Sequence, residues 1–166
     1  MHQIAHSLRE GGLTLAYHAI VTVRDALRRA VRPTELGVRA VVVRGERLLM
    51  VRHRSGAAPW SLPGGGVNRG EDLAAAALRE VREEGGCAAR VERLLGMYYQ
   101  NAHGFNNHVA IFVCAALGEA RPPIADIEIV DARFFLPQDI PANSDPGSLR
   151  RIAEYRQGLA GEARPW

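Results

Sequence analysis

The feature that most constrains the fold of this chain is a glycine-rich turn joined directly to one amphipathic helix. The turn reads LPGGGV at residues 62–67, and a helical period runs from about residue 71 to residue 85. Consecutive glycines let a backbone approach another group closely. The apolar face of the predicted helix is formed by Leu73, Ala77, Leu78 and Val81, and its alanines are small. We therefore expect this helix to pack closely on a sheet.

The last turn of this helix carries three carboxylates that face the same way. Glu80, Glu83 and Glu84 are neighbours on a helical surface, where like charges repel. They also lie at the end of the helix where the macrodipole favours cations. One interpretation is a solvated helix face on which Arg79 and Arg82 pair with these carboxylates. The glycine turn upstream favours another, a bound cation such as Mg²⁺ or Mn²⁺, which prefer oxygen ligands.

Short apolar runs on both sides of this unit predict a sheet. Residues 37–43 and 47–53 are typical of a hairpin, and further strands are predicted over 91–100, 108–117 and 128–136. We expect a loop at 101–107. A short helical turn over 137–140, a helix over 145–157 and an irregular tail complete the prediction. The pattern fits an α/β or α+β fold.

The first 33 residues form a separate region, for which we predict a helical extension. Apolar residues from Leu13 to Ala30 follow a helical period, and Pro33 ends it. The apolar run is too short to span a bilayer. We expect this helix to pack on the core or on a second subunit, which would make a homodimer, with attachment to a membrane surface as the alternative. Residues 34–145 would then be the main domain and residues 146–166 a C-terminal helix and tail.

The charge composition argues against a nucleic-acid partner. The net charge is +3, and all 21 cationic residues are Arg, with no Lys. Such uniform usage is typical of a GC-rich coding sequence rather than of a binding surface. Cys87 and Cys114 lie on apolar elements, which predicts two reduced, buried thiols and a cytoplasmic protein.

The segment from Gly65 to Cys87 resembles the Nudix box of the Nudix hydrolase family. The family pattern is G-x5-E-x7-R-E-U-x-E-E-x-G-U, where U is a bulky apolar residue. The fixed positions are filled by Gly65, Glu71, Arg79, Glu80, Val81, Glu83, Glu84 and Gly86. Cys87 stands at the last U and is smaller than the usual aliphatic residue. The resemblance implies an α/β/α sandwich with a mixed sheet.

The resemblance also implies roles for the residues of the box. Glu80, Glu83 and Glu84 would bind Mg²⁺ or Mn²⁺ together with the carbonyl of Gly64. Arg79 would orient Glu80, and Glu71 would support the cluster from the start of the helix. Glu80 and Arg79 would thus belong to the catalytic machinery.

Outside the box, the candidate residues each have a structural alternative. Family members often use a further glutamate as a general base, for which Glu128 is our choice, with Asp126 and Asp131 as rivals. Arg52 and Arg54 could hold substrate phosphates or face solvent. Trp60 and Phe105 could stack on a ring or pack in the core. His103 and His108 could carry protons or contact phosphate, or play no catalytic role.

Two functions of different classes follow from these residues. The first is a Mg²⁺-dependent hydrolase that cleaves a pyrophosphate bond in a nucleoside diphosphate linked to another group, such as a nucleoside triphosphate or a nucleotide sugar. The second is a non-catalytic module that binds a nucleotide as a sensor. The complete set of Arg79 and the three carboxylates favours the hydrolase.

Overall fold

The computed structural model describes residues 22–23, 34–54, 56–57, 59–102, 105–123 and 127–165. The helix predicted over residues 1–33 lies outside the described residues, apart from Thr22 and Val23. The division of the chain at residue 145 stays a prediction. In the described part of the chain, no helix is long and apolar enough to cross a membrane.

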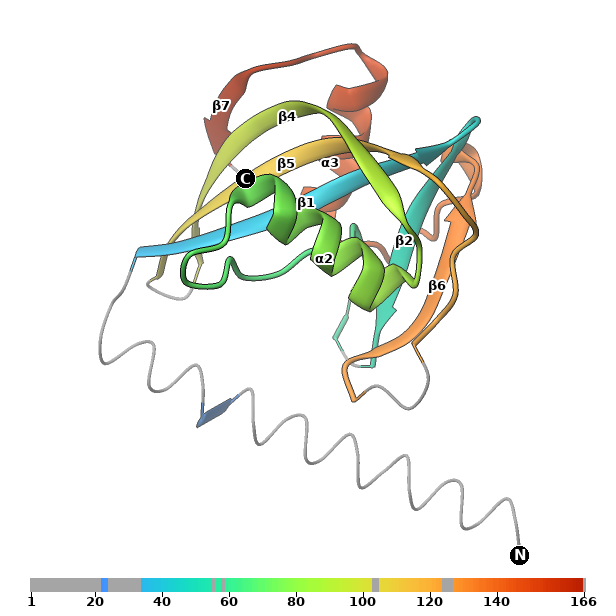
Figure 1. The fold of residues 1–166 in the computed structure, drawn as a ribbon, viewed down its shortest axis with the longest axis horizontal. Helices are drawn as coiled ribbons and strands as arrows, with labels where there is room; N and C mark the ends of the chain where they lie inside the picture. Colours follow the sequence, from blue (N-terminus) through green and yellow to red (C-terminus); the bar gives the residue numbers. More distant parts are fainter. Residues whose placement is uncertain are drawn as a thin grey trace, which may run out of the picture.

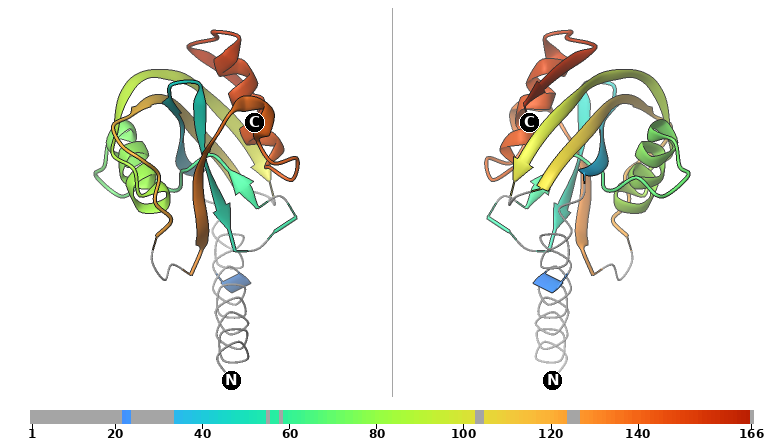
Figure 2. Two further views of the ribbon diagram at one scale, coloured as in Figure 1. Left: turned by 90° about the vertical axis from the view of Figure 1, so that its right-hand side faces the viewer. Right: turned by 90° about the vertical axis from the view of Figure 1, so that its left-hand side faces the viewer.

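The described residues form one mixed sheet with a helix on each face (Figures 1 and 2). The strand order is β3-β2-β1-β5-β4-β7, and β6 also pairs with β2. β1 pairs with β5 and β4 with β7 in parallel, whereas the other pairs are antiparallel. The strands are β1 (Thr34–Arg44), β2 (Arg47–His53), β3 (Trp60–Ser61), β4 (Ala89–Ala102), β5 (Phe105–Ala116), β6 (Ile129–Phe135) and β7 (Glu162–Pro165). The helices are α2 (Leu73–Gly85), η1 (Pro137–Asp139) and α3 (Pro146–Arg156).

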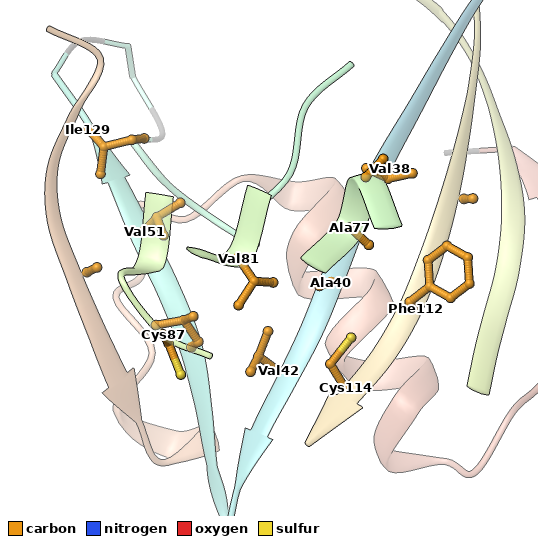
Figure 3. Close-up of a cluster of buried hydrophobic side chains, with 14 residues drawn as sticks. Val38, Ala40, Val42, Val51, Ala77, Val81, Cys87, Phe112, Cys114 and Ile129 are labelled. Atoms are coloured by element: carbon orange, nitrogen blue, oxygen red, sulfur yellow. The ribbon is translucent and has the colours of Figure 1, made fainter. Parts of the chain in front are cut away.

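Alternation along the central strands creates two hydrophobic cores, one on each face of the sheet. In β1, Val38, Ala40 and Val42 point to the first core, whereas Val41 points to the second. The first core packs against α2 through Ala77 and Val81 (Figure 3). The second core includes Ile152 of α3. The two layers of helix confirm the predicted α/β/α sandwich.

The glycine turn is itself hydrogen-bonded to β1. The β1–β2 hairpin has only two register pairs, Val43↔Leu48 and Arg44↔Arg47, and β2 then continues against β6. In the opening between the two strands, the amide of Val38 donates to the carbonyl of Gly65 at 2.9 Å. The amide of Ala40 donates to Pro63, and that of Val67 to Leu36. Residues 62–67, the glycine loop, are therefore held against β1 by backbone hydrogen bonds like those between paired strands.

Both ends of α2 are fixed by local chemistry. The carboxylate of Asp72 caps the start by accepting from the amides of Ala74 and Ala75, each at 2.9 Å. The helix therefore begins at Leu73, two residues later than predicted. Gly86 ends it in the left-handed region with φ of 57°, and a Cβ there would lie 2.1 Å from the carbonyl oxygen of Arg121. Only glycine fits this position without a shift of the backbone.

Two predictions of where the strands lie are wrong. β5 begins at Phe105, so the predicted loop over 101–107 is largely strand. The predicted irregular tail contains β7, which pairs in parallel with β4 at Gly96↔Glu162. The buried, unpaired thiols of Cys87 and Cys114 agree with the prediction.

Candidate functional site

The site begins where the glycine loop meets the last turns of α2. The amide of Gly64 donates to Oε2 of Glu84 at 2.8 Å. Gly64 has φ of 155°, and a Cβ there would lie 2.1 Å from the carbonyl oxygen of Val38. A Cβ on Gly65 would lie 2.6 Å from Oε1 of Glu80. These two glycines therefore let the backbone touch both carboxylates directly.

Arg79 joins the two ends of α2. Its Nε and Nη2 donate to the two carboxylate oxygens of Glu71 at 2.8 and 3.0 Å, a bidentate pair. Its Nη1 donates to Oε1 of Glu80 at 2.7 Å and to Oε2 of Glu83 at 3.0 Å. Its Nη2 also reaches the carbonyl of Gly66 at 2.9 Å. One guanidinium thus ties the start of the helix, the glycine loop and the acidic last turn together.

The electrostatics divide these carboxylates into two kinds. The hydrogen bonds from Arg79 lower the pKa of Glu71 to about 2, so this group is a fixed anion. Burial raises the pKa of Glu80 in spite of Arg79, and the nearby charges of Glu83 and Glu128 add to the effect. Burial raises the pKa of Glu84 to about 7, although the amide of Gly64 and the charge of His53 oppose it. The protein's own cations therefore leave Glu80 and Glu84 undercompensated.

The donor set fits a hard divalent cation. Among the described residues, no three Asp, Glu, His or Cys side chains already converge as a formed metal site. Glu80 and Glu84, however, flank Gly64 and Gly65 and offer oxygen ligands. A cation between them would relieve the charge that burial makes unfavourable. Glu83 is 55% exposed and bound to Arg79, so of the three carboxylates it is the one most open to solvent.

Glu128 lies close enough to the box to influence it. It comes just before β6, and its charge contributes to the raised pKa of Glu80. Its Oε1 is 3.6 Å from Nδ1 of His53, whose Nε2 is 2.9 Å from Oγ of Ser61. His53 and Ser61 were not among the residues predicted from the sequence. The available signal was the place of His53 at the end of a predicted strand, between Arg52 and Arg54.

The rival bases are in different positions. Asp131 is buried, and Arg133 holds both of its oxygens, with Nε at 3.0 Å and Nη2 at 2.7 Å. This pair engages both oxygens of the carboxylate. Asp126 lies outside the described residues.

The predicted substrate residues that the structure describes, Arg52, Arg54, Trp60 and His108, do not gather at one place. Trp60 is buried in the second core, with its ring edge-to-face on Phe135 at 5.1 Å. The guanidinium carbon of Arg52 lies over the Trp60 ring, 5.9 Å from its centroid, and Nε of Arg52 is 4.0 Å from Oδ2 of Asp131. Arg54 is nearer to the candidate base, because its amide donates to the carbonyl of Glu128 and its Nε to that of Ile127.

Of the remaining three candidates, His108 and the backbone of Phe105 belong to β5. His108 is on β5 with its ring 5.2 Å from that of Tyr99 on β4. The backbone of Phe105 begins β5, but its side chain is outside the described part of the chain. His103 is also outside the described residues.

Comparison with known proteins places this geometry in one family. The model of the NUDIX domain matches residues 33–155. A putative 8-oxo-dGTP diphosphatase of Bacillus subtilis is 28% identical over 123 residues, which are 74% of this chain and 80% of that protein. A crystal structure of a UDP-X diphosphatase has 27% identity and a TM-score of 0.65, covering 80% of this chain and 67% of that one. A NUDIX hydrolase from Nitrosomonas europaea has 26% identity and a TM-score of 0.69, covering 78% and 93%.

Proposed function

The chain belongs to the Nudix family, and from that premise we propose that it is a Mg²⁺- or Mn²⁺-dependent hydrolase of nucleotides. It would cleave a pyrophosphate bond in a nucleoside diphosphate linked to another group, for example a nucleoside triphosphate or a nucleotide sugar. The observation that carries the proposal is the pair of Glu80 and Glu84, which face the glycine loop with too little positive charge around them.

We assign the cation to Glu80 and Glu84, assisted by Glu83 and by the carbonyl of Gly64. When bound, Mg²⁺ or Mn²⁺ supplies positive charge for the phosphate oxygens and lowers the pKa of an attacking water. Arg79 holds Oε1 of Glu80 through its Nη1, which fixes the direction of that carboxylate. Glu71 in turn fixes Arg79.

Glu128 is the proposed general base. Its carboxylate lies near Glu80 and outside the ion-pair network of Arg79. It would accept the proton of the attacking water. His53, at 3.6 Å, restricts where that carboxylate can point. Arg54 is hydrogen-bonded to the carbonyls of Ile127 and Glu128. Of the two arginines, it is therefore the better placed to contact a phosphate near Glu128.

Two of the similar proteins favour a nucleotide substrate without fixing which one. One related protein is named as a diphosphatase for 8-oxo-dGTP and another for UDP-X. Both named substrates contain a nucleoside diphosphate linked to a further group. A cytoplasmic location and a homodimer formed through residues 1–33 belong to the same proposal.

The test is hydrolysis of a nucleotide panel by the wild-type protein and a Glu84→Gln variant. The panel holds nucleoside triphosphates, nucleotide sugars and dinucleotides with Mg²⁺ or Mn²⁺, and the nucleotide products are separated and measured by anion-exchange chromatography. We expect activity on at least one class, lost on chelation and lowered at least about a hundredfold in Glu84→Gln. Glu92→Gln, at an exposed site on β4, is the matched control and should leave the rate unchanged.

The sensor alternative predicts different results from the same panel. A sensor would bind a nucleotide with no turnover by the wild-type protein under any metal condition. Activity that survives in Glu84→Gln would instead contradict the assigned metal site. The two failures are therefore distinguishable.

A further inference from the structure

A pocket of about 590 Å³ opens beside the glycine loop, at the start of the parallel strands β1 and β5. Its walls come from the first residues of these strands and from the loop itself. The lining includes Gly37, Gly65, Gly66, Val67, Asn107 and Val109. The parallel register places Glu35 beside Asn107 and Gly37 beside Val109.

Gly37 leaves space in the pocket beside the glycine loop. A Cβ at this position would lie 3.3 Å from the carbonyl oxygen of Gly65, 3.7 Å from Oδ1 of Asn107 and 3.8 Å from Val109. It would therefore stand between the loop and the carboxamide. The lining is mostly polar: Glu35, Arg39 and the carboxamide lie beside the valines. Polar groups of this kind fix the orientation of a bound organic ligand.

Oδ1 of Asn107 is the unusual group in this pocket. It is buried, and among the described residues it has no hydrogen-bond partner. Buried acceptors are nearly always paired in folded proteins, so an unpaired one needs an explanation. A donor on a ligand would satisfy it.

The pocket also adjoins the proposed metal site. Gly65 lines the pocket, and a Cβ on this residue would lie 2.6 Å from Oε1 of Glu80. Gly64, also in the lining, donates its amide to Glu84. A ligand whose phosphates lie against these carboxylates can therefore extend its other half over the glycine loop into the pocket.

We propose that this pocket binds the base of the nucleotide and that Oδ1 of Asn107 accepts a hydrogen bond from an N–H group of that base. This deepens the proposed function and rests on it for the nature of the ligand. Each of the four common bases carries an N–H donor beside an acceptor, and an asparagine carboxamide matches such an edge. Asn107 is thus a specificity-determining residue rather than part of the chemistry.

The test uses binding rather than hydrolysis, because nucleoside monophosphates contain no pyrophosphate bond. AMP, GMP, CMP and UMP are titrated without metal into the wild-type protein and into Asn107→Leu, and amide chemical shifts report affinity. The best monophosphate is compared with an analogue whose N–H donor is absent or methylated, and with ribose 5-phosphate. Asn143→Leu makes the same change at an exposed site outside the pocket.

We expect Asn107→Leu to weaken the best monophosphate by about three- to tenfold, which is the usual effect of one neutral hydrogen bond. It should bind the monophosphate and its donor-free analogue equally, and its affinity for ribose 5-phosphate should not change. Asn107→Asp keeps an acceptor and should retain the preference for the donor. The melting temperature of Asn107→Leu without ligand should not fall, since the change removes an unpaired buried oxygen.

Three results would overturn the proposal: no monophosphate binds to the wild-type protein, Asn107→Leu changes the affinity by less than about twofold, or it weakens ribose 5-phosphate equally. Binding that depends on Asn107 in a protein that hydrolyses no nucleotide would instead refute the proposed function and leave the pocket assigned. Nucleotide hydrolysis whose rate and substrate preference are the same in the wild type and in Asn107→Leu would support the proposed function and refute the assignment of the pocket.

Discussion

Replacing Glu84 by Gln should make the metal-free protein more stable while abolishing its activity. Burial raises the pKa of Glu84 from 4.5 to about 7, which means that the fold disfavours the ionised carboxylate. Gln has nearly the same shape, and its carbonyl oxygen can still accept from the amide of Gly64. The variant therefore removes the buried charge and keeps the hydrogen bond.

The size and the pH dependence of the effect follow from that pKa. A tenfold change in acidity corresponds to about 1.4 kcal/mol, so the full penalty of a shift from 4.5 to about 7 is at most about 3.5 kcal/mol. Because Glu84 is partly exposed, we expect about 1–3 kcal/mol. Below pH 4.5 the carboxyl is neutral in both states and contributes nothing. Between pH 4.5 and 7 the folded protein keeps a proton that the unfolded chain releases, so stability falls as pH rises, and above pH 7 the penalty is complete.

The assay is urea denaturation with EDTA at pH 5 and pH 8. The free energy of unfolding of Glu84→Gln should exceed that of the wild-type protein by about 1–3 kcal/mol at pH 8 and by much less at pH 5. Glu92→Gln, at an exposed site, should match the wild type at both values. A variant that is no more stable than wild type at pH 8, or equally stabilised at both values, would refute the reasoning.

Adding Mg²⁺ should reverse the order of stability. A cation that binds only the folded protein raises its free energy of unfolding by about 2.7 kcal/mol at a hundred times its Kd. The wild-type protein should gain this stability at pH 8, and Glu84→Gln should gain little of it.

Three other substitutions test the surroundings of the acidic turn. Arg79→Lys loses the bidentate contact with Glu71 and the fork that also reaches Glu80, Glu83 and the carbonyl of Gly66, so we expect kcat/KM to fall by about 10–100-fold with the far-ultraviolet circular dichroism unchanged. Gly65→Ala should push Glu80 away, because its Cβ would lie 2.6 Å from Oε1 of that residue. A calorimetric titration with Mn²⁺ should show metal affinity at least about tenfold weaker than that of the wild type. Gly66→Ala, where a Cβ meets open space, should leave the metal affinity unchanged. His53→Ala removes the contact between His53 and the carboxylate of Glu128 and should lower kcat by at least about tenfold with little change in KM, and a change in KM alone would contradict a positioning role.

The features that local sequence determines were predicted well. The helix of the box, its glycine end and its close contact with the sheet follow from residues near one another in the chain. The family and the fold class rest on the same segment and are confirmed. The helix begins at Leu73 rather than at Glu71, a difference of two positions. It arises because the side chain of Asp72 caps the helix by accepting hydrogen bonds from its first amides.

The features that depend on distant partners were not predicted. The residue types at 105–107, Phe-Asn-Asn, give no strand signal of their own. These residues are extended because β5 pairs with the start of β1. β7 likewise needs β4 as its partner. The approach of His53 to Glu128 joins residues far apart in the chain, and the unpaired oxygen of Asn107 becomes visible only when β1, β5 and the glycine loop are in place.

The parallel pairing of β1 with β5 has a consequence for how the protein folds. Its register runs from Thr34↔Asn106 to Val43↔Ala115, so the pairing closes a long loop that contains β2, the glycine loop, α2 and β4. Pairing between such distant segments is slow to form. α2 can be helical earlier, but the wall of the pocket and the backbone bonds that hold the glycine loop need β1 in its final place. A newly made chain should therefore acquire its helix before it can hold either metal or nucleotide.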